Sequence, residues 1–350
     1  MPPSPFWIET DDWHTAGEPF RIVDKLPEGY MPTSSTVAQR RFDIIADPRH
    51  PLDQLRQSLC HEPRGHADMY GGFITPPDDE GAAFGVLFWH KDGFSTACGH
   101  GTIALGYWAV AKSLVKLPES GNGKVDVVID VPSGRVTASM NIAGGKPVSA
   151  DFINVPSYQL AKALPVKIPS RDVEVSVDLA FGGAVYATLD AQQLGLKVEP
   201  RNVDEFIRLG REIKASLGER AHYGAYDCYG VIVFNEEGDD EGQDGTGIVR
   251  QRNVTVFADG QIDRSPCGSG TCARLAVLYA QGRLGPRQSK LLHRSIIESV
   301  FQGDIVSEVK SPIEGFPACI PRVTGEARLC GKMSFYIDPE EDIYPGFLLR

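Results

Sequence analysis

One pattern, Cys-Gly-x-Gly-Thr-x-Ala, occurs twice in this chain, starting at Cys98 and at Cys267. Each copy runs into a mostly apolar stretch of helical character, TIALGYWAVA after the first and TCARLAVLYA after the second. Repetition of the whole arrangement indicates two similar folding units, each with one cysteine at the start of a helix. The repeat therefore predicts two pseudo-symmetric domains whose helix starts face each other across a cleft.

The length of 350 residues agrees with this division, because one hydrophobic core seldom serves so long a chain. A composition of 42% hydrophobic and 23% charged residues is typical of a globular protein. The segment that most resembles a join between domains is INVPSYQL, residues 153–160. There, strands around one cysteine motif give way to strands around the other.

The remaining pattern predicts a mixed α/β protein with much antiparallel pairing. Helical spacing of apolar residues predicts helices over 51–59 and 203–218. The acidic segment EEGDDEGQDG, residues 236–245, has no apolar side chain and is expected to be a solvated loop between strands. Alternating or continuous apolar runs predict strands over residues 124–131, 134–142, 173–181 and 230–234.

Charge and composition restrict the class of partner. A formal net charge of −11 without a basic cluster argues against nucleic acid and against an anionic membrane surface, so the substrate is expected to be small. No stretch reaches the ~18 consecutive apolar residues of a spanning helix, and the N-terminus lacks the features of a signal peptide. Seven cysteines without a C-x-x-C spacing suit free thiols in a reducing compartment. We therefore expect a cytoplasmic protein.

The repeated motif combines a potential base with a potential anion site. The positive end of a helix dipole and free backbone N–H groups lower the pKa of a thiol at a helix N-terminus. The same N–H groups bind carboxylates, and glycine allows a ligand to approach the backbone. Two such thiols on opposite sides of one Cα could remove a proton from one face and return one to the other.

Other interpretations of the cysteines are weaker. A lone cysteine before glycine is usually a small buried hydrophobe, but duplication of the entire pattern favours catalysis. A cysteine hydrolase, with Cys98 or Cys267 activated by a histidine such as His222, stays possible but leaves one thiol unexplained. The other five cysteines lack the setting of these two and are expected to be inert: Cys60, Cys228, Cys272, Cys319 and Cys330.

Cofactor and metal motifs do not fit their required contexts. Both copies match G-x-G-x-x-A, but neither directly follows an apolar strand, and no acid lies about 20 residues past Gly268. A phosphate-binding G-K-[ST] sequence is absent. His61 and His66 are five residues apart, which is the wrong spacing for one helix face, and no HExxH occurs. We therefore expect neither metal nor cofactor.

With DRSPCGSGT and ACGHGT in view, the sequence resembles the proline racemase family, whose relatives include diaminopimelate epimerase. Further matches are HTAGEPFRIV (14–23), EPRGHADMYGG (62–72), AFGGAVYA (180–187) and the ending GFLL. The resemblance implies two diaminopimelate epimerase-like domains, each a curved mixed sheet or barrel around a central helix, with the active site in the cleft between them. It also implies a homodimer without cofactor. With the C-terminal strand returning to the first domain, the expected domains are 1–155 with 335–350, and 156–334.

The resemblance also assigns roles to individual residues. Cys98 and Cys267 stand at the positions of the paired acid and base. The side chains of His100 and Asp263 would meet the substrate amine. Arg64, His66 and Asp68 match a family motif that we expect to shape the pocket. The backbone N–H groups that would hold the substrate carboxylate are those of Gly99, His100, Gly268 and Ser269.

Two reactions are compatible with the family resemblance. A pair of cysteines resembles proline racemases and 4-hydroxyproline epimerases, whereas cysteine with threonine resembles trans-3-hydroxyproline dehydratases. The flanking sequence looks more like the dehydratase branch, from which the chain departs at Cys267. We expect inversion at Cα of proline or a hydroxyproline, because that reaction needs the second thiol. Dehydration of trans-3-hydroxy-L-proline to pyrroline-2-carboxylate is the alternative, and a sensor that only binds an imino acid is a third.

Overall fold

The computed structural model describes residues 4–242, 247–286 and 289–349. The chain divides into two compact units, residues 1–150 with 326–350, and residues 151–325. The chain passes from the first unit to the second within β8 (Lys146–Ile153). It returns to the first unit between β17 (Ala318–Gly325) and β18 (Ala327–Ile337). The first boundary expected from the sequence, after residue 155, lies five residues further along the chain, and the second, after residue 334, lies nine residues further.

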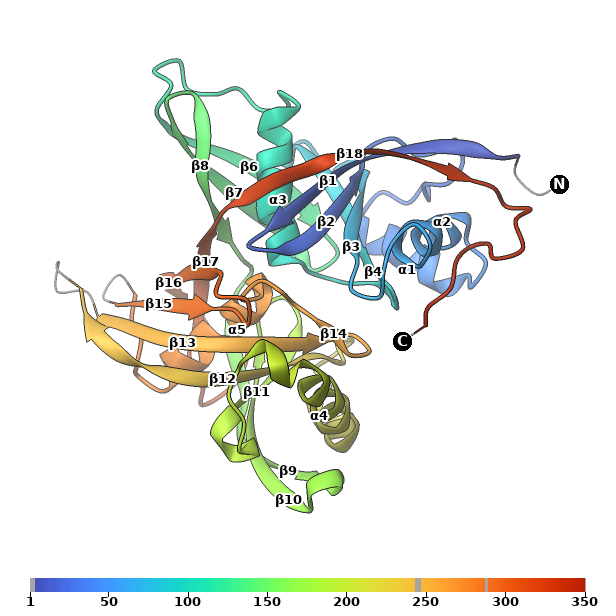
Figure 1. Cartoon of the computed structure of the whole chain (residues 1–350). Coiled ribbons are helices and arrows are strands. Elements are labelled where there is room, and N and C mark those ends of the chain that lie inside the picture. Colours follow the sequence, from blue (N-terminus) through green and yellow to red (C-terminus); the bar gives the residue numbers. More distant parts are fainter. Residues whose placement is uncertain (1–3, 243–246, 287–288, 350) are drawn as a thin grey trace. The chain divides into compact units, whose positions relative to one another are not determined.

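The first unit is a mixed sheet with three helices (Figure 1). Its strand order is β18-β1-β2-β3-β4-β6-β7, with β5 paired to β4 as a short hairpin. The pairs β2·β3 and β4·β6 are parallel, and the other pairs are antiparallel. The elements are β1 (Phe6–Thr15), β2 (Glu18–Val23), α1 (Val37–Ala46), α2 (Pro51–Cys60), β3 (Tyr70–Thr75), β4 (Phe84–His90), β5 (Gly93–Phe94), α3 (Gly99–Ala111), β6 (Gly123–Val131), β7 (Gly134–Ala143) and β18.

Helix α3 lies inside the curve of this sheet. It contacts β1, β2 and β18 near one end of the strand order and β6 and β7 at the other. Every residue from Gly99 to Ala109 is buried, because the sequence is apolar around the whole circumference of the helix. The helices α1 and α2 pack on a separate core that includes Leu52, Leu55 and Leu59.

The second unit closes its sheet on itself. Its strand order is β9-β10-β11-β12-β13-β15-β16-β17, and β17 pairs with β9. The pairs β11·β12 and β13·β15 are parallel, and β14 forms a hairpin with β13. The elements are β9 (Ser157–Ile168), β10 (Val173–Phe181), β11 (Val185–Asp190), α4 (Val203–Leu217), β12 (Cys228–Glu241), β13 (Gly247–Phe257), β14 (Gln261–Ile262), α5 (Gly268–Ala280), β15 (Ser289–Arg294), β16 (Val300–Val309) and β17, with short 3-10 turns at Pro169–Arg171, Ala191–Leu194, Pro200–Asn202 and Gly218–Ala221.

Helix α5 lies inside the closed sheet of the second unit, just as α3 lies inside the curved sheet of the first. It contacts β9, β10, β11, β16 and β17, and its residues Gly268–Leu278 are buried. Helix α4 covers the outside, where Phe206, Leu209 and Ile213 pack on the strands. The central helix is therefore a core element, and its first turn is held by the surrounding strands.

The two units share one order of elements. Two strands (β1 and β2) precede the covering helices in the first unit and three (β9 to β11) precede the covering helix in the second. In both, two strands, a short hairpin strand, the central helix and further strands then follow. In both units the strand that precedes the short hairpin strand pairs in parallel with the strand that follows the central helix, as β4 with β6 and β13 with β15. The predicted fold class, two pseudo-symmetric domains with a central helix in a curved sheet or barrel, is confirmed, as are the helices expected over 51–59 and 203–218.

The expected loop over 236–245 is wrong for its first part, because β12 continues to Glu241. Residues 243–246 lie outside the described residues. The acidic side chains are accommodated in the sheet by arginines. Arg283 pairs with Glu236 at 2.7 Å and with Asp239 at 3.1 Å, and Arg252 pairs with Glu237 at 2.8 Å. Such pairs stabilise a polar strand that hydropathy alone does not reveal.

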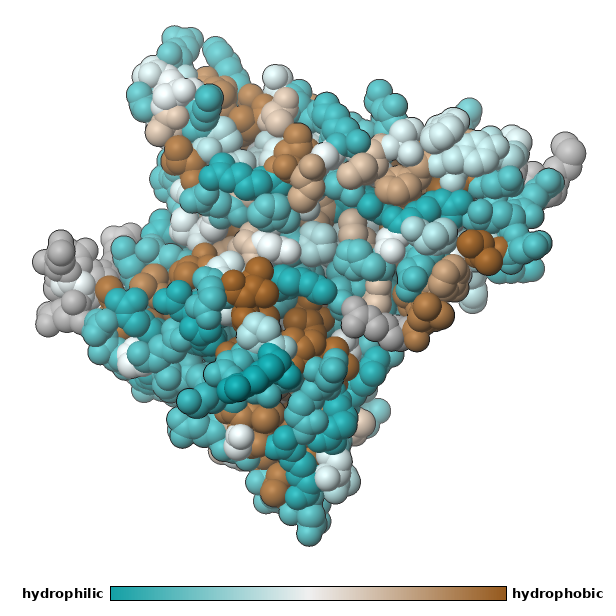
Figure 2. Space-filling model, in the orientation of Figure 1, coloured by the Kyte–Doolittle hydropathy of each residue, from teal (hydrophilic) through white to brown (hydrophobic). Residues whose placement is uncertain are grey.

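The apolar residues gather in the cores of the two units. On the face shown in Figure 2, hydrophilic side chains predominate and hydrophobic ones form scattered groups. Within the described ranges, no helix has both the length and the apolar character needed to cross a membrane.

Candidate active site

Cys98 caps the central helix of the first unit. Its backbone is extended, with φ of −155°, and its Sγ accepts a hydrogen bond from the N–H of Gly101 at 3.2 Å. Its carbonyl accepts both the N–H of Thr102 at 3.0 Å and the Thr102 hydroxyl at 2.8 Å. The residue is only 4% exposed. The sulfur therefore stands among the backbone N–H groups that a helix start leaves without intrahelical partners.

The second glycine of the motif leaves room for the sulfur. A Cβ on Gly101 would lie 2.7 Å from Cys98 Sγ and 2.5 Å from a ring carbon of Phe20. At the matching position in the second unit, a Cβ on Gly270 would lie 2.8 Å from Cys267 Sγ. Real Cβ atoms essentially never approach another heavy atom within 3.0 Å. The spacing Cys-Gly-x-Gly is thus required by the volume of the thiol in both copies.

His100 is buried against two aromatic rings. Its ring centroid lies 4.9 Å from that of Tyr70 and 5.9 Å from that of Phe20, in edge-to-face arrangements. Its Nδ1 lies 3.4 Å from Cys98 Sγ. Burial lowers the pKa of His100 to about 3, so the imidazole is neutral at physiological pH. A neutral ring nitrogen can accept a hydrogen bond from an ammonium group.

Cys267 has a different backbone conformation from Cys98. Its φ is +66° and its ψ is +114°, a combination that residues with a Cβ rarely adopt. Its carbonyl accepts the N–H of Thr271 at 2.8 Å, which begins α5, and its own N–H donates to Ser265 Oγ at 3.0 Å. The residue is 6% exposed. Two copies of one sequence pattern therefore hold their thiols by different local geometry.

The hairpin of β10 and β11 packs on the first turn of α5. Tyr186, fully buried on β11, places its hydroxyl 2.7 Å from Ser269 Oγ and 3.8 Å from Cys267 Sγ. A Cβ on Gly182 would lie 2.5 Å from the carbonyl oxygen of Ser269. This close packing fixes the backbone that the sequence predicts as the second carboxylate site.

The predicted lowering of the thiol pKa is wrong for Cys267. Burial raises the pKa of Cys267 well above its usual range, and the nearby carboxylate of Asp263 raises it further. The cost of a negative charge in this dry position exceeds the stabilisation that the helix N-terminus provides. Cys267 is consequently a neutral thiol at physiological pH and is suited to donate a proton.

Asp263 is joined to the cysteine loop by Ser265. Its Oδ1 accepts the N–H of Ser265 at 2.8 Å and the Ser265 hydroxyl at 2.7 Å. Burial raises the pKa of Asp263 to about 6. The group is therefore largely a carboxylate at neutral pH and becomes protonated as the pH falls through about 6.

A family model described as Proline racemase matches residues 11–348. The chain belongs to the proline racemase family. The resemblance drawn from the cysteine motifs is thereby confirmed.

Named relatives of this proline racemase family member differ in activity. A trans-3-hydroxy-L-proline dehydratase from Bacillus thuringiensis is 39% identical over 97% of each chain. A 3-hydroxyproline 2-epimerase from Burkholderia multivorans is 37% identical over 98% of each chain. The solved structure of a hydroxyproline epimerase from Agrobacterium vitis, with bound trans-4-hydroxy-L-proline, superposes with a TM-score of 0.83 at 27% identity, covering 98% of this chain and 96% of the other.

The other cysteines of this proline racemase family chain lack the features of the motif thiols. All seven cysteines are free. Burial raises the pKa of Cys60 and Cys319 to about 12 and that of Cys228 to about 11, and it also raises the pKa of Cys272. These shifts agree with the expectation that the four are inert. Cys330 is exposed on β18.

The histidine considered for a cysteine hydrolase is paired with two carboxylates. The His222 side chain is 41% exposed and pairs with Glu219 at 3.1 Å and with Asp227 at 3.3 Å. These partners engage both ring nitrogens. This arrangement gives no support to a cysteine–histidine pair built on Cys267.

Sequence reasoning missed several residues that shape the two half-sites. Phe20, Tyr70 and Tyr186 lie within the family-like segments 14–23, 62–72 and 180–187. Ser265 lies between Asp263 and Cys267 in the second motif. The segments were visible in the sequence, but the contacts join positions far apart in the chain.

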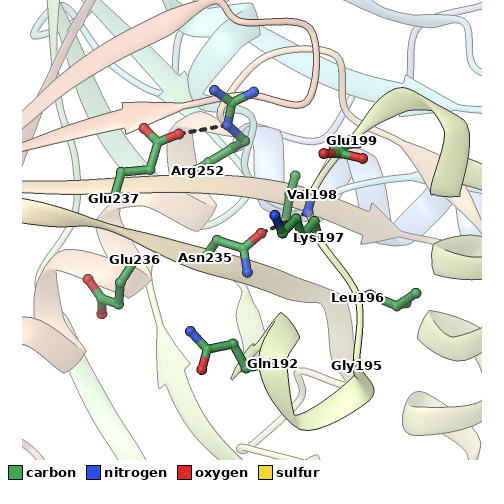
Figure 3. Close-up of a pocket in the computed structure, with 10 residues that line it drawn as sticks. All are labelled: Gln192, Gly195, Leu196, Lys197, Val198, Glu199, Asn235, Glu236, Glu237 and Arg252. Carbon is green, nitrogen blue, oxygen red and sulfur yellow. Dashed lines mark hydrogen bonds and ion pairs between the residues drawn. The ribbon is translucent and has the colours of Figure 1, made fainter.

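The pocket in Figure 3 is separate from the predicted residues. It has a volume of about 680 Å³ and lies in the second unit between residues 192–199 and the strands β12 and β13. None of the predicted site residues lines it. Among its lining residues, Glu237 pairs with Arg252, and the Asn235 side chain accepts the backbone N–H of Val198. We assign it no role in catalysis.

Proposed function

We propose that this protein inverts the configuration at Cα of proline or a hydroxyproline without a cofactor, using Cys98 and Cys267 as a paired acid and base. One observation carries the proposal. Each unit presents an almost fully buried thiol at the first turn of a buried central helix, with a glycine that makes room for the sulfur. Inversion at one carbon is the reaction that specifically needs two such groups.

Backbone N–H groups at the two helix starts would bind the substrate carboxylate. The donors would be those of Gly99 and His100 in the first unit and Gly268 and Ser269 in the second. Negative charge that develops on the carboxylate as Cα loses its proton would be stabilised by the same groups, and burial makes each hydrogen bond stronger than in water. A secondary ring amine cannot form an ordinary pyridoxal Schiff base, which favours this route.

The substrate amine would be held by Asp263 and His100. The carboxylate of Asp263 compensates the charge of the ring nitrogen, and the neutral imidazole of His100 accepts a hydrogen bond. In one direction the Cys98 thiolate removes the Cα proton while the Cys267 thiol donates its proton to the opposite face. The enzyme then holds the reversed protonation pattern, which serves the opposite enantiomer.

We expect kcat/KM for the substrate to fall as the pH is lowered through about 6. The pKa of Asp263 is raised by burial to about 6, so protonation below this pH removes the charge that pairs with the substrate amine. The His100 pKa of about 3 lies too low to cause this decline. A pH profile of kcat/KM from 4.5 to 8 measures the effect, and Asp263→Asn should lack it. An unchanged acid limb in Asp263→Asn would assign the titration to another group.

Dehydration of trans-3-hydroxy-L-proline is the second candidate. The observation in its favour is the 39% identity to the Bacillus dehydratase, which is close to the 37% identity to the Burkholderia epimerase. β-Elimination needs one base at Cα and an acid for the leaving hydroxyl, so a second thiol does not prevent it. The presence of Cys267 favours inversion because elimination does not require a proton donor on the opposite face of Cα.

A substrate panel separates the two reactions. L-proline, trans-4-hydroxy-L-proline and trans-3-hydroxy-L-proline are incubated separately, and products are resolved by chiral chromatography and by assay for the cyclic imine. We expect an inverted product from at least one substrate. Pyrroline-2-carboxylate from trans-3-hydroxy-L-proline, with no inverted product from any of the three, would establish the dehydratase instead. Ligand-induced stabilisation without any product would indicate a binding protein.

We further propose that the enzyme is a cytoplasmic homodimer that acts on a free imino acid and binds neither nucleic acid nor membranes. Support comes from the family membership and from the net charge of −11 without a basic cluster. Light scattering coupled to size-exclusion chromatography tests the assembly. A mass of one chain, 38.1 kDa, would contradict the dimer.

A further inference from the structure

We propose that the peptide group between Pro266 and Cys267 is clamped at both of its polar atoms, and that this clamp holds the Cys267 thiol in its working position. The inference rests on the proposed function only in taking that thiol as catalytic. The residues of the peptide clamp are Ser265, Asn253, Thr271 and His293. The sequence analysis assigned none of these four residues to the active site.

The clamp is needed because the Cys267 backbone is strained. A φ of +66° is disfavoured for a residue with a Cβ and persists only where surrounding contacts over-determine it. Cys98, with φ of −155°, has ordinary extended backbone. Only the second thiol therefore needs external restraint to keep its direction.

Ser265 restrains the N–H side of the peptide. The Cys267 N–H donates to Ser265 Oγ at 3.0 Å, and the Ser265 hydroxyl donates to Asp263 Oδ1 at 2.7 Å. Ser265 is completely buried. The predicted partner of the substrate amine and the backbone of the thiol are thus joined through a single hydroxyl.

Asn253 restrains the carbonyl side from β13. Its Nδ2 donates to the Pro266 carbonyl at 3.2 Å and to the Arg294 carbonyl at 3.3 Å. The orientation of its amide is fixed because Oδ1 accepts the Thr255 hydroxyl at 3.2 Å. Asn253 is fully buried on a central strand and cannot move without disrupting the sheet.

A histidine–threonine relay provides the second bond to this carbonyl. Thr271 Oγ1 lies 3.2 Å from the Pro266 carbonyl oxygen and 2.8 Å from His293 Nδ1. His293 is fully buried, and its Nε2 has no hydrogen-bond partner among the described residues. A buried N–H without an acceptor costs more than a buried lone pair, which places the ring proton on Nδ1. His293 then donates to Thr271, and Thr271 donates to the carbonyl.

The first copy of the motif uses its threonine differently. The Thr102 hydroxyl bonds to the carbonyl of Cys98 itself, at 2.8 Å, rather than to the residue before it. The threonine of the same motif thus belongs to a simple helix start in one unit and to a backbone restraint in the other. The four clamp residues are positioning residues, because they act on the thiol through its backbone.

Ser265→Ala tests the clamp, and Ser265→Thr tests whether the hydroxyl accounts for the effect. Two quantities are measured: kcat for inversion, and the rate at which iodoacetamide labels Cys267, followed by peptide mass spectrometry. Labelling of Cys98 in the same molecules is the internal reference. Ser311→Ala is the matched control, since the Ser311 hydroxyl also accepts a backbone N–H two residues on, from Ile313 at 3.1 Å.

We expect Ser265→Ala to lower kcat and to raise Cys267 labelling roughly tenfold, as the backbone relaxes from the strained φ. The Cys98 labelling rate should not change. Ser265→Thr should restore both quantities toward the wild-type values. Asn253→Ala, which releases the other end of the peptide, should reproduce the effect of Ser265→Ala, and Ser311→Ala should not.

Unchanged Cys267 labelling in both Ser265→Ala and Asn253→Ala would overturn the clamp. Equal acceleration at Cys98 and Cys267 would also overturn it, because that result indicates general loosening of the protein. Because labelling does not require turnover, failure of the proposed function can be distinguished from failure of the clamp. A protein inactive on the whole substrate panel but with selectively accelerated Cys267 labelling retains the clamp and loses only the proposed activity.

Discussion

Replacing either Cys98 or Cys267 by serine should lower the rate of Cα inversion by on the order of 10³-fold, within the range of general acid–base contributions. Serine keeps the size of the side chain, but its hydroxyl is a far weaker acid than a thiol and supplies almost no anion at neutral pH. Both variants should fail, because each direction of the reaction uses one group as base and the other as acid. Initial rates with each enantiomer, followed by polarimetry, measure the loss.

Cys272→Ser is the control for replacing a buried thiol by a hydroxyl. Cys272 lies on the same helix as Cys267, is fully buried and is absent from the proposed chemistry. It should retain the wild-type rate per folded molecule. If either motif variant retained wild-type inversion of both enantiomers, the paired-thiol mechanism would be wrong.

Replacing Gly101 or Gly270 by alanine should lower kcat by roughly 10²-fold, the effect of displacing a reacting group by about 1 Å. The added Cβ would lie 2.7 Å from Cys98 Sγ in the first case and 2.8 Å from Cys267 Sγ in the second. Either the sulfur or the start of the helix must therefore move. Steady-state kinetics measure the loss, and thermal unfolding separates it from loss of folded protein.

Gly106→Ala is the matched control for overpacking on the same central helix as Gly101. Its Cβ would lie 2.5 Å from Met140 Sδ, away from the thiol. We expect a comparable destabilisation, about 1–3 kcal/mol for overpacking, without a specific loss of kcat. If Gly101→Ala and Gly106→Ala lowered kcat equally, the motif glycine would matter for folding and not for the position of the sulfur.

The location of both thiols could be predicted from the sequence because the signals are local. The motif cysteine, the glycines and the apolar run lie within one segment in each copy, and the expected helix begins directly after the cysteine in both, at Gly99 and Gly268. The duplication also indicated two similar units. These conclusions needed only residues that are neighbours in the chain.

The different conformations of the two cysteines could not be predicted, because they depend on distant residues. The φ of Cys267 is set by Asn253 on β13 and by His293 on β15, acting on a motif that is nearly identical to the first. Within the segment itself, Ser265 contributes by accepting the Cys267 N–H, but a serine at that position does not by itself predict a positive φ.

Two sequence-based expectations failed because one physical effect was considered without its competitor. The helix N-terminus favours the thiolate of Cys267, but burial opposes it more strongly. The acidic segment after Asn235 lacks apolar residues, but Arg283 and Arg252 provide charge pairs that allow β12 to continue. Burial and long-range charge pairing are both consequences of the tertiary fold.

Isotope incorporation at low conversion tests the central claim most directly. The substrate that reacts in the panel is incubated with the wild-type protein in D2O. At low conversion the two enantiomers are separated, and the deuterium content of each is measured by mass spectrometry. Two thiols on opposite faces predict deuterium at Cα of the inverted product and ordinary hydrogen in the remaining substrate. An inverted product that keeps its original hydrogen, or deuterium that enters the substrate without inversion, would contradict the account.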